Sequence, residues 1–363
     1  SSMPVTYIRV DHFNGGGSFT HALVRDGVYG SLLGEARRAL HGRAAAWFAE
    51  RDRALHAEHL GRAGDPDAPR TFLAAAEALA ADHHYERALQ LVEQGVALAG
   101  ERSDRFALAC LRADLLQTLG DAGASIEAYR EALDHAGDDA GKCQAWIGIA
   151  AGVRLQGGAE EGLEALDHAQ ALTRPEGFDL ALAQIHHYRG NFHFGAGDIG
   201  PCFEQQELAL GHAERAGDPD WQARVLGGLG DAYYARCRMS TSLDYFRRCI
   251  ELCRDHGLIR IEVANRYMVG ITKRYMNEFD GALEDVLAAT EMARRVGNRR
   301  AEMYALNLVG ELYNERGRYD EVEAPMEGAL ALTDVLGNRR FKAYAMMQIG
   351  RLRLAEGRAE DAR

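Results

Sequence analysis

The chain has 363 residues, and 42 Lys and Arg against 54 Asp and Glu give it a net charge of −12 at pH 7. This acidic balance argues against a general nucleic-acid binder, and a hydrophobic fraction of 47% argues against a disordered chain. No run of 18 apolar residues is present, so the sequence predicts no membrane-spanning segment. The 40 glycines and 7 prolines suggest turns between helices rather than collagen or a linker.

The first residues differ in pattern from the rest of the chain. Residues 5–10 alternate and are β-branched, which predicts a strand; residues 14–17 (Asn-Gly-Gly-Gly) predict a turn, and Ser18 opens a helical pattern. We expect residues 1–64 to form a small winged-helix-like remnant with linking helices, and residues 65–363 to form a solenoid. No signal peptide is predicted, because a charged start followed by a long apolar core is missing.

In the rest of the chain, glycines recur every forty residues in three series. The first is Gly190, Gly230, Gly270, Gly310 and Gly350; the second is Gly137, Gly177, Gly217, Gly257, Gly297 and Gly337; the third is Gly157, Gly197, Gly317 and Gly357, with Cys237 and Asn277 in its gaps. A fixed period of this length is the signature of a repeat architecture in which each unit is one supersecondary element.

Each forty-residue unit has the pattern of two amphipathic helices. After Gly230 come Tyr233, Ser242, Phe246 and Cys249, at spacings that place one packing stripe on each helix. We expect the first glycine series at helix crossings, where a missing side chain allows close approach. The third series, including Asn277, should turn the hairpin, and the second should cap the second helix in the left-handed conformation.

This order of residues resembles the tetratricopeptide repeat (TPR): a glycine and an aromatic residue on the first helix, then small, large and small residues on the second. The nominal repeat has 34 residues, and the longer unit here resembles its long-helix variety. HEAT-type repeats share the period but lack this order. The resemblance implies an all-α, right-handed superhelical solenoid of helical hairpins. We expect seven complete repeats between about residues 69 and 335, and an eighth that Arg363 truncates, as in a fragment of a larger protein.

Shorter segments carry a second resemblance, to bacterial multidomain signalling ATPases of the STAND type. The segments are 19–23 (FTHAL), 28–33 (VYGSLL) and 37–41 (RRALH) before the repeats, and 185–191, 229–236 and 247–261 within them. The last three are similar to the C-terminal region of such ATPases fused to class III adenylate/guanylate cyclases. The resemblance implies a cytoplasmic, non-enzymatic sensor arm. LuxR-type ATP-binding transcription regulators share this plan, and a standalone peptide-binding adaptor is a further alternative.

Candidate catalytic and metal-binding residues each have a simpler interpretation. Residues 137–143 (GDDAGKC) have only three residues between Gly and Gly-Lys and follow no strand, so they do not predict a phosphate loop. The histidine pairs at 83–84 and 186–187 lack metal-ligand spacing. Cys249 and Cys253 are predicted core thiols, because Cys249 occupies a small packing position. We therefore assign no catalytic, cofactor-binding or metal-binding residue.

A binding surface is the remaining candidate. In a solenoid of hairpins the first helix of each unit lines the concave face, and aromatic, Arg and Asn side chains there can anchor a protein or peptide ligand. The residues predicted to face this groove are His187, Asn191, Phe194, Arg224, Asp231, Tyr234, Tyr267, Arg274, Tyr275, Asn307, Glu311, Asn314, Tyr344 and Arg351. The ATPase and cyclase domains of the parent protein are further expected partners; nucleic acid and membranes are not expected.

Overall fold

The computed structural model describes residues 8–11, 16–19, 22–174 and 176–362. Near the N-terminus, β1 (Ile8–Asp11) pairs antiparallel with β2 (Gly16–Phe19). The expectation that Ser18 opens a helix is wrong, because Ser18 lies in β2 and pairs with Arg9. The first described helix begins at Ala22 instead.

Several predictions for the N-terminal region fall partly on residues outside the description. These are residues 5–7 of the predicted strand, residues 14 and 15 of the predicted turn, and residues 20 and 21 of the segment 19–23. The winged-helix interpretation and the boundary after residue 64 stay predictions.

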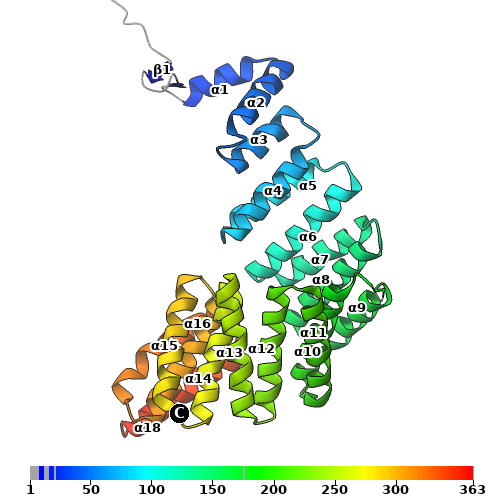
Figure 1. Cartoon of the computed structure of the whole chain (residues 1–363). Helices are drawn as coiled ribbons and strands as arrows, with labels where there is room; N and C mark the ends of the chain where they lie inside the picture. The colour runs from blue at the N-terminus through cyan, green and yellow to red at the C-terminus, as the bar shows by residue number, and fades with distance from the viewer. Residues whose placement is uncertain (1–7, 12–15, 20–21, 175, 363) are drawn as a thin grey trace, which may run out of the picture. The chain divides into compact units, whose positions relative to one another are not determined.

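Beyond the sheet, the described chain is helical, with short turns between the helices (Figure 1). The helices are α1 (Ala22–Ser31), α2 (Gly34–Phe48), α3 (Arg53–Ala63), α4 (Ala68–Ala81), α5 (Tyr85–Leu98), α6 (Arg102–Leu119), α7 (Ala122–His135), α8 (Asp139–Gln156), α9 (Ala159–Ala171), α10 (Asp179–Ala196), α11 (Ile199–Ala216), α12 (Pro219–Ala235), α13 (Met239–His256), α14 (Ile259–Tyr275), α15 (Phe279–Arg295), α16 (Arg299–Glu315), the 3₁₀ helix η1 (Tyr319–Glu321), α17 (Glu323–Leu336) and α18 (Arg339–Ala355). None of the described helices is both long and apolar enough to cross a membrane.

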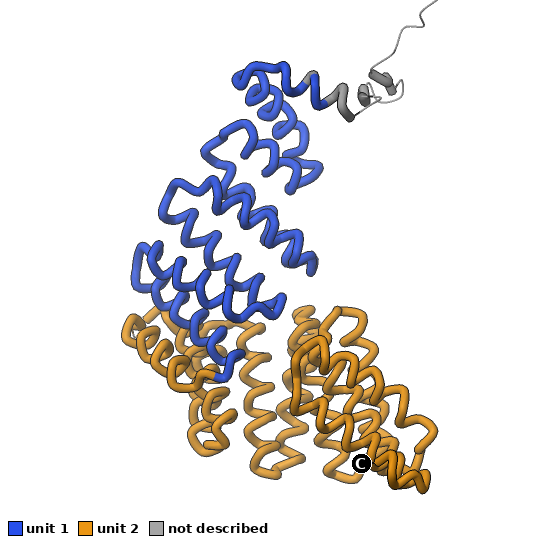
Figure 2. The backbone as a smooth tube through the Cα atoms, turned by 180° about the vertical axis from the view of Figure 1, so that it is seen from behind, with its two compact units in different colours: residues 1–157 blue, residues 158–363 orange. Residues whose placement is uncertain are grey.

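Consecutive helices pack as hairpins, for example α4 on α5, α6 on α7, α10 on α11 and α12 on α13. The predicted fold class is confirmed: the helical part of the described chain is a TPR-type solenoid of helical hairpins. The chain forms two compact units, residues 1–157 (unit 1) and residues 158–363 (unit 2), coloured separately in Figure 2.

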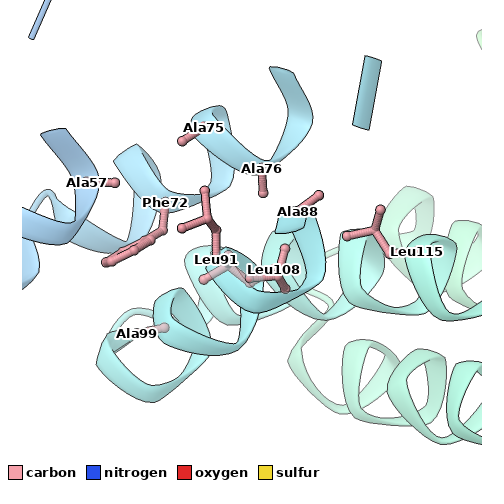
Figure 3. Packing of buried hydrophobic residues seen from close by; sticks show 10 residues of the cluster. Ala57, Phe72, Ala75, Ala76, Ala88, Leu91, Ala99, Leu108 and Leu115 are labelled. Carbon is pink, nitrogen blue, oxygen red and sulfur yellow. The ribbon is translucent and has the colours of Figure 1, made fainter. Parts of the chain in front are cut away.

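Each unit is held together by local apolar clusters between neighbouring helices. In unit 1, the ring of Phe72 on α4 lies among Leu91 on α5, Leu108 on α6 and small alanine side chains (Figure 3). In unit 2, one cluster joins Phe246 on α13 to Met268 on α14. Such nearest-neighbour cores are expected for repeat proteins, whose units bury apolar surface against adjacent units.

The predicted hairpin turns are confirmed by the backbone. Asn277 has φ +64° and Cys237 has φ +58°, matching the glycines of the same series. The expected left-handed cap is wrong at Gly177, which lies beyond Leu172, the right-handed C-cap of α9, and at Gly137, which is not among the positive-φ residues. There α7 ends on Ala136 in an extended conformation, whose N–H donates to the carbonyl oxygen of Leu133, so no left-handed residue is required.

Candidate functional site

All fourteen predicted binding residues lie on the first helices of the hairpins in unit 2, namely α10, α12, α14, α16 and α18. Each of these helices contacts the next one in this series. We call the surface that carries the fourteen residues the first-helix face. The repeat period explains this placement, because equivalent positions forty residues apart come to lie on adjacent first helices.

The fourteen side chains differ in how far solvent reaches them. Phe194, Arg224, Tyr275, Tyr344 and Arg351 are exposed; Asn191, Asp231, Tyr234, Tyr267, Arg274 and Asn314 are half-buried; His187, Asn307 and Glu311 are buried. The exposed and half-buried members can reach a partner directly. The buried members act through the network that surrounds them.

On α10, His187 and Asn191 belong to an internal hydrogen-bond network with Gln206 of α11. His187 Nδ1 lies 3.1 Å from Gln206 Oε1, and Asn191 Nδ2 lies 3.0 Å from His187 Nε2. Gln206 Nε2 donates to Asn191 Oδ1 at 3.2 Å and to the carbonyl oxygen of His187. Because Asn191 Nδ2 donates to His187 Nε2, this ring nitrogen carries no proton. The proton is then on Nδ1, which donates to Gln206 Oε1, so the imidazole is neutral. These polar atoms are therefore engaged within unit 2.

Gln206 was missed by the sequence analysis, although a signal for it exists. Gln206 occupies the position that holds a large apolar residue in the second helix of later repeats. At successive steps of forty residues, this position holds Phe246, Val286 and Met326. A fully buried amide at an apolar packing position implies polar partners, because an unpaired buried amide is costly. Its partners proved to be two of the predicted face residues.

Two of the three arginines of the first-helix face, Arg224 and Arg274, are paired with acids of the same unit. Arg274 on α14 donates to Glu311 Oε1 at 3.0 Å and to Glu315 Oε2 at 2.8 Å, both on α16. Burial raises the pKa of Glu311, and Arg274 partly offsets this. On α12, Arg224 pairs with Asp220, one turn earlier.

Aromatic side chains form contacts along the face. The Tyr234 and Tyr275 rings lie 5.8 Å apart, edge to face. Tyr304 links Tyr267, at 5.3 Å, to Phe341, at 4.4 Å. Tyr304 and Phe341 were not predicted, although Tyr304 precedes Tyr344 by forty residues and could have been assigned from that spacing.

Asp231 on α12 differs from the other acids of the face. Its side chain is half-buried, and no described group forms a hydrogen bond or ion pair with its carboxylate. Burial, the single cause acting on it, raises the pKa of Asp231 to about 7. A carboxylate that is desolvated without a counter-charge is destabilising in its ionised form.

Carboxamides on α16 and α18 have unused hydrogen-bonding atoms. Asn307 Nδ2 donates to the Met303 carbonyl oxygen at 2.9 Å, and Asn314 Nδ2 donates to the carbonyl oxygen of Gln348 at 3.0 Å. In the described part of the chain, Asn307 Oδ1, Asn314 Oδ1 and Gln348 Nε2 have no partner. Asn307 and Asn314 are seven residues apart, on one side of α16.

Two surface cavities lie away from the predicted residues. One, of about 570 Å³, is lined by residues of α15, α16, η1 and α17, including Leu306, Tyr313 and Pro325. The other, of about 160 Å³, lies between α13, α14 and α15. Neither is lined by any of the fourteen predicted residues.

The segments considered for other chemistry have structural roles. In residues 137–143, the carboxylate of Asp138 caps α8 by accepting from the Gly141 N–H at 2.8 Å, so this N–H is not free for a phosphate. Cys249 and Cys253 are buried in an apolar cluster. Within the described ranges, no group of three or more His, Cys, Asp or Glu side chains is placed to hold a metal ion.

Family models of the tetratricopeptide repeat match residues 107–138 and residues 181–255. The chain carries TPRs. The second match covers α10 to α13 almost completely, and so includes part of the first-helix face. A comparison with curated proteins finds no match.

Solved structures share the fold at low identity. A Pyrococcus horikoshii signal transduction ATPase with numerous domains, which has a TPR sensor, matches with TM-score 0.60 and 13% identity over 96% of this chain and 54% of that chain. A Rap protein complexed with competence and sporulation factor matches with TM-score 0.61 and 10% identity over 82% and 85%. Aspartyl phosphate phosphatase F from Bacillus subtilis matches with TM-score 0.54 and 13% identity over 86% and 82%. The chain thus spans about half of the signalling ATPase.

Proposed function

We propose that this chain is the protein-interaction and sensor arm of a multidomain signalling ATPase, and that the first-helix face of unit 2 binds an extended segment of a protein partner. The proposal combines the TPR architecture with the chemistry of this face. The chain itself has no catalytic role in the proposal.

The observation that carries the binding proposal is the set of exposed rings and polar side chains on neighbouring first helices. Tyr275 on α14 and Tyr344 on α18 are exposed and supply apolar contact area. Tyr234 on α12 and Asn314 on α16 are half-buried on the same face. An extended peptide presents both N–H and C=O groups along its length, and polar side chains of this kind can pair with them.

The assignment to a signalling ATPase is supported by two independent likenesses. The segments 19–23, 28–33 and 37–41 resemble the region that follows the nucleotide-binding core of such ATPases, and a STAND protein with a TPR sensor shares the fold over nearly the whole chain. We further propose that the parent carries a class III cyclase and that ligand binding alters its output. Such coupling requires that the ligand bind two states of the parent with different affinity.

A second candidate is a standalone peptide-binding adaptor. It is favoured by the likeness to the Rap protein with bound competence and sporulation factor, because this chain covers 85% of that structure. The complete reading frame separates these candidates. An upstream GxxxxGK[ST] segment supports the ATPase arm, and a reading frame without one supports the adaptor. A helix-turn-helix segment would support a transcription regulator.

A peptide selection tests the binding face. Random dodecapeptides displayed on phage are selected against the 363-residue chain and then tested on Tyr275→Ala and Tyr344→Ala. Both tyrosines are exposed, so neither replacement should unfold the protein. Tyr319→Ala, an equally exposed tyrosine in η1 outside the face, is the matched control. Peptides that lose binding to the two face variants but keep it on the control support the proposal. Peptides indifferent to both face variants contradict it.

A further inference from the structure

The carboxylate of Asp231 on the first-helix face has no counter-charge in the described part of the chain. Among the described residues, no Lys, Arg or His pairs with its carboxylate, and no hydrogen bond is made to it. We propose that Asp231 and the tyrosines beside it form a subsite that takes a cationic group of the bound segment, either an Arg or Lys side chain or a free N-terminal ammonium. This inference rests on the proposed function of the face and adds the chemistry of its ligand.

Two of the chain's own arginines near this subsite are already paired with acids. Arg224, two turns before Asp231 on α12, is paired with Asp220 and lies 5.3 Å from the Trp221 ring centre. Arg274 on α14 is held by Glu311 and Glu315. Neither can neutralise Asp231 without leaving another acid unpaired. Arg300 on α16 acts on the phenol of Tyr267 but does not pair with Asp231. A bound ligand can therefore supply the missing counter-charge.

The surroundings of Asp231 suit an organic cation. Tyr234 is three residues further along the same helix, and its ring contacts Tyr275 of α14 edge to face. Burial raises the pKa of the phenol of Tyr267, also on α14, and the nearby Asp231 charge adds to this rise. Ammonium and guanidinium groups are attracted to tyrosine faces as well as to carboxylates. A bound metal ion would instead need several oxygen ligands, and among the described residues Asp231 is not part of any group of three or more His, Cys, Asp or Glu side chains that could hold one.

One turn before Asp231, Gly227 on α12 packs against the carboxamide of Asn265 on α14: a Cβ at residue 227 would lie 2.3 Å from Asn265 Oδ1. Asn265 Nδ2 is bound to the Ile261 carbonyl oxygen at 2.9 Å, which orients Oδ1 as the free acceptor. A guanidinium, with five N–H groups, can serve more than one such acceptor.

The test repeats the dodecapeptide selection on the wild-type chain and on Asp231→Asn. Asp244→Asn is the matched control, since Asp244 is an exposed acid on α13, outside the face, and no described group forms an ion pair with it. We expect a recurrent Arg or Lys, or a dependence on the free N-terminus, in peptides selected on wild type and Asp244→Asn. The same peptides should bind Asp231→Asn at least about tenfold more weakly, as expected for loss of one charge pair.

Synthetic versions of the best peptide separate the two sources of charge. Replacement of its Arg by neutral citrulline tests the side chain, and N-terminal acetylation tests the ammonium. The inference is supported if one of these changes weakens binding to wild type but not to Asp231→Asn. It is overturned, with the proposed function intact, if peptides depend on Tyr275 and Tyr344 yet bind wild type and Asp231→Asn equally. Peptides that depend on none of these residues overturn both.

Discussion

The ring of Phe246 on α13 fills the space that a side chain at Gly230 on α12 would need. A Cβ at residue 230 would lie 2.6 Å from Phe246 Cε1, a distance that real Cβ atoms do not reach. The same relationship links Gly310 to Met326 one repeat later. The forty-residue glycine spacing therefore reflects where the second helix presses its largest side chain against the first.

Gly230→Ala should destabilise unit 2. The added methyl overlaps a fully buried ring that has no free space to move into, and overpacking of this kind costs about 1–3 kcal/mol. Gly195→Ala on α10 is the control, because nothing lies within 4 Å of its Cβ and alanine favours a helix by about 1 kcal/mol. Urea unfolding followed by circular dichroism gives both values. Equal stabilities of the two variants would contradict the packing role of Gly230.

Gln206→Met should destabilise the protein although methionine has a similar volume. The change removes the donor and acceptor that serve His187 and Asn191, and each buried group left unpaired costs about 1–3 kcal/mol. The same change at exposed Gln94 on α5 should have little effect, because both residues have similar helix propensity. Denaturant titration measures the difference. If the two variants unfold together, the His187–Asn191–Gln206 network does not contribute to stability.

Cys237→Gly should stabilise the hairpin between α12 and α13. Cys237 has φ +58°, a left-handed conformation that costs an ordinary residue about 1–2 kcal/mol and costs glycine little. The greater freedom of glycine in the unfolded chain offsets part of this, so we expect a gain of up to about 1 kcal/mol. Ser240→Gly, three residues later in the first turn of α13, should instead lose up to about 0.5 kcal/mol. A rise in Tm for the first and a fall for the second is the expected pair of results.

The unpaired carboxylate of Asp231 should make stability depend on pH. Its pKa is raised to about 7 in the folded chain, against about 3.9 for an unfolded Asp. Asp231 therefore loses its proton at a lower pH in the unfolded chain than in the folded chain. Its contribution to the free energy of unfolding falls as pH rises from about 4 to 7. Asp231→Asn removes the penalty, so the variant should be more stable than wild type at pH 8, with a smaller difference at lower pH.

The neighbours of Asp231 do not titrate in this window. Burial raises the pKa of the Tyr234 and Tyr267 phenols, raises that of Cys202 to about 11, and contributes to the raised pKa of Cys249, so all four keep their protons. The paired arginines Arg224 and Arg274 stay charged. Thermal unfolding of wild type and Asp231→Asn between pH 5 and 8 therefore isolates one carboxylate. A difference that stays constant over this range would be incompatible with a raised pKa.

The helical hairpins were predictable because their causes are local or strictly periodic. Left-handed turns favour Gly and Asn, and the forty-residue spacing of such residues placed Asn277 and Cys237 correctly. Where more than one backbone conformation can end or continue a segment, the sequence predicted the structure less well. The end of α7 uses an extended Ala136 instead of a left-handed Gly137, and Ser18 continues a strand, because its pairing with Arg9 is a contact between segments.

The face was predicted as a surface but not as a set of interactions. Helical periodicity placed His187 and Asp231 on first helices, since that depends only on spacing. Periodicity could not show that His187 would form a hydrogen bond with Gln206 on another helix, or that Asp231 would have no partner among the described residues. Hydrogen bonds and ion pairs between helices depend on which side chains meet across a helix interface. The sequence by itself determined the repeat, its turns and its first-helix positions; the tertiary structure alone decided which of those side chains remain free to bind.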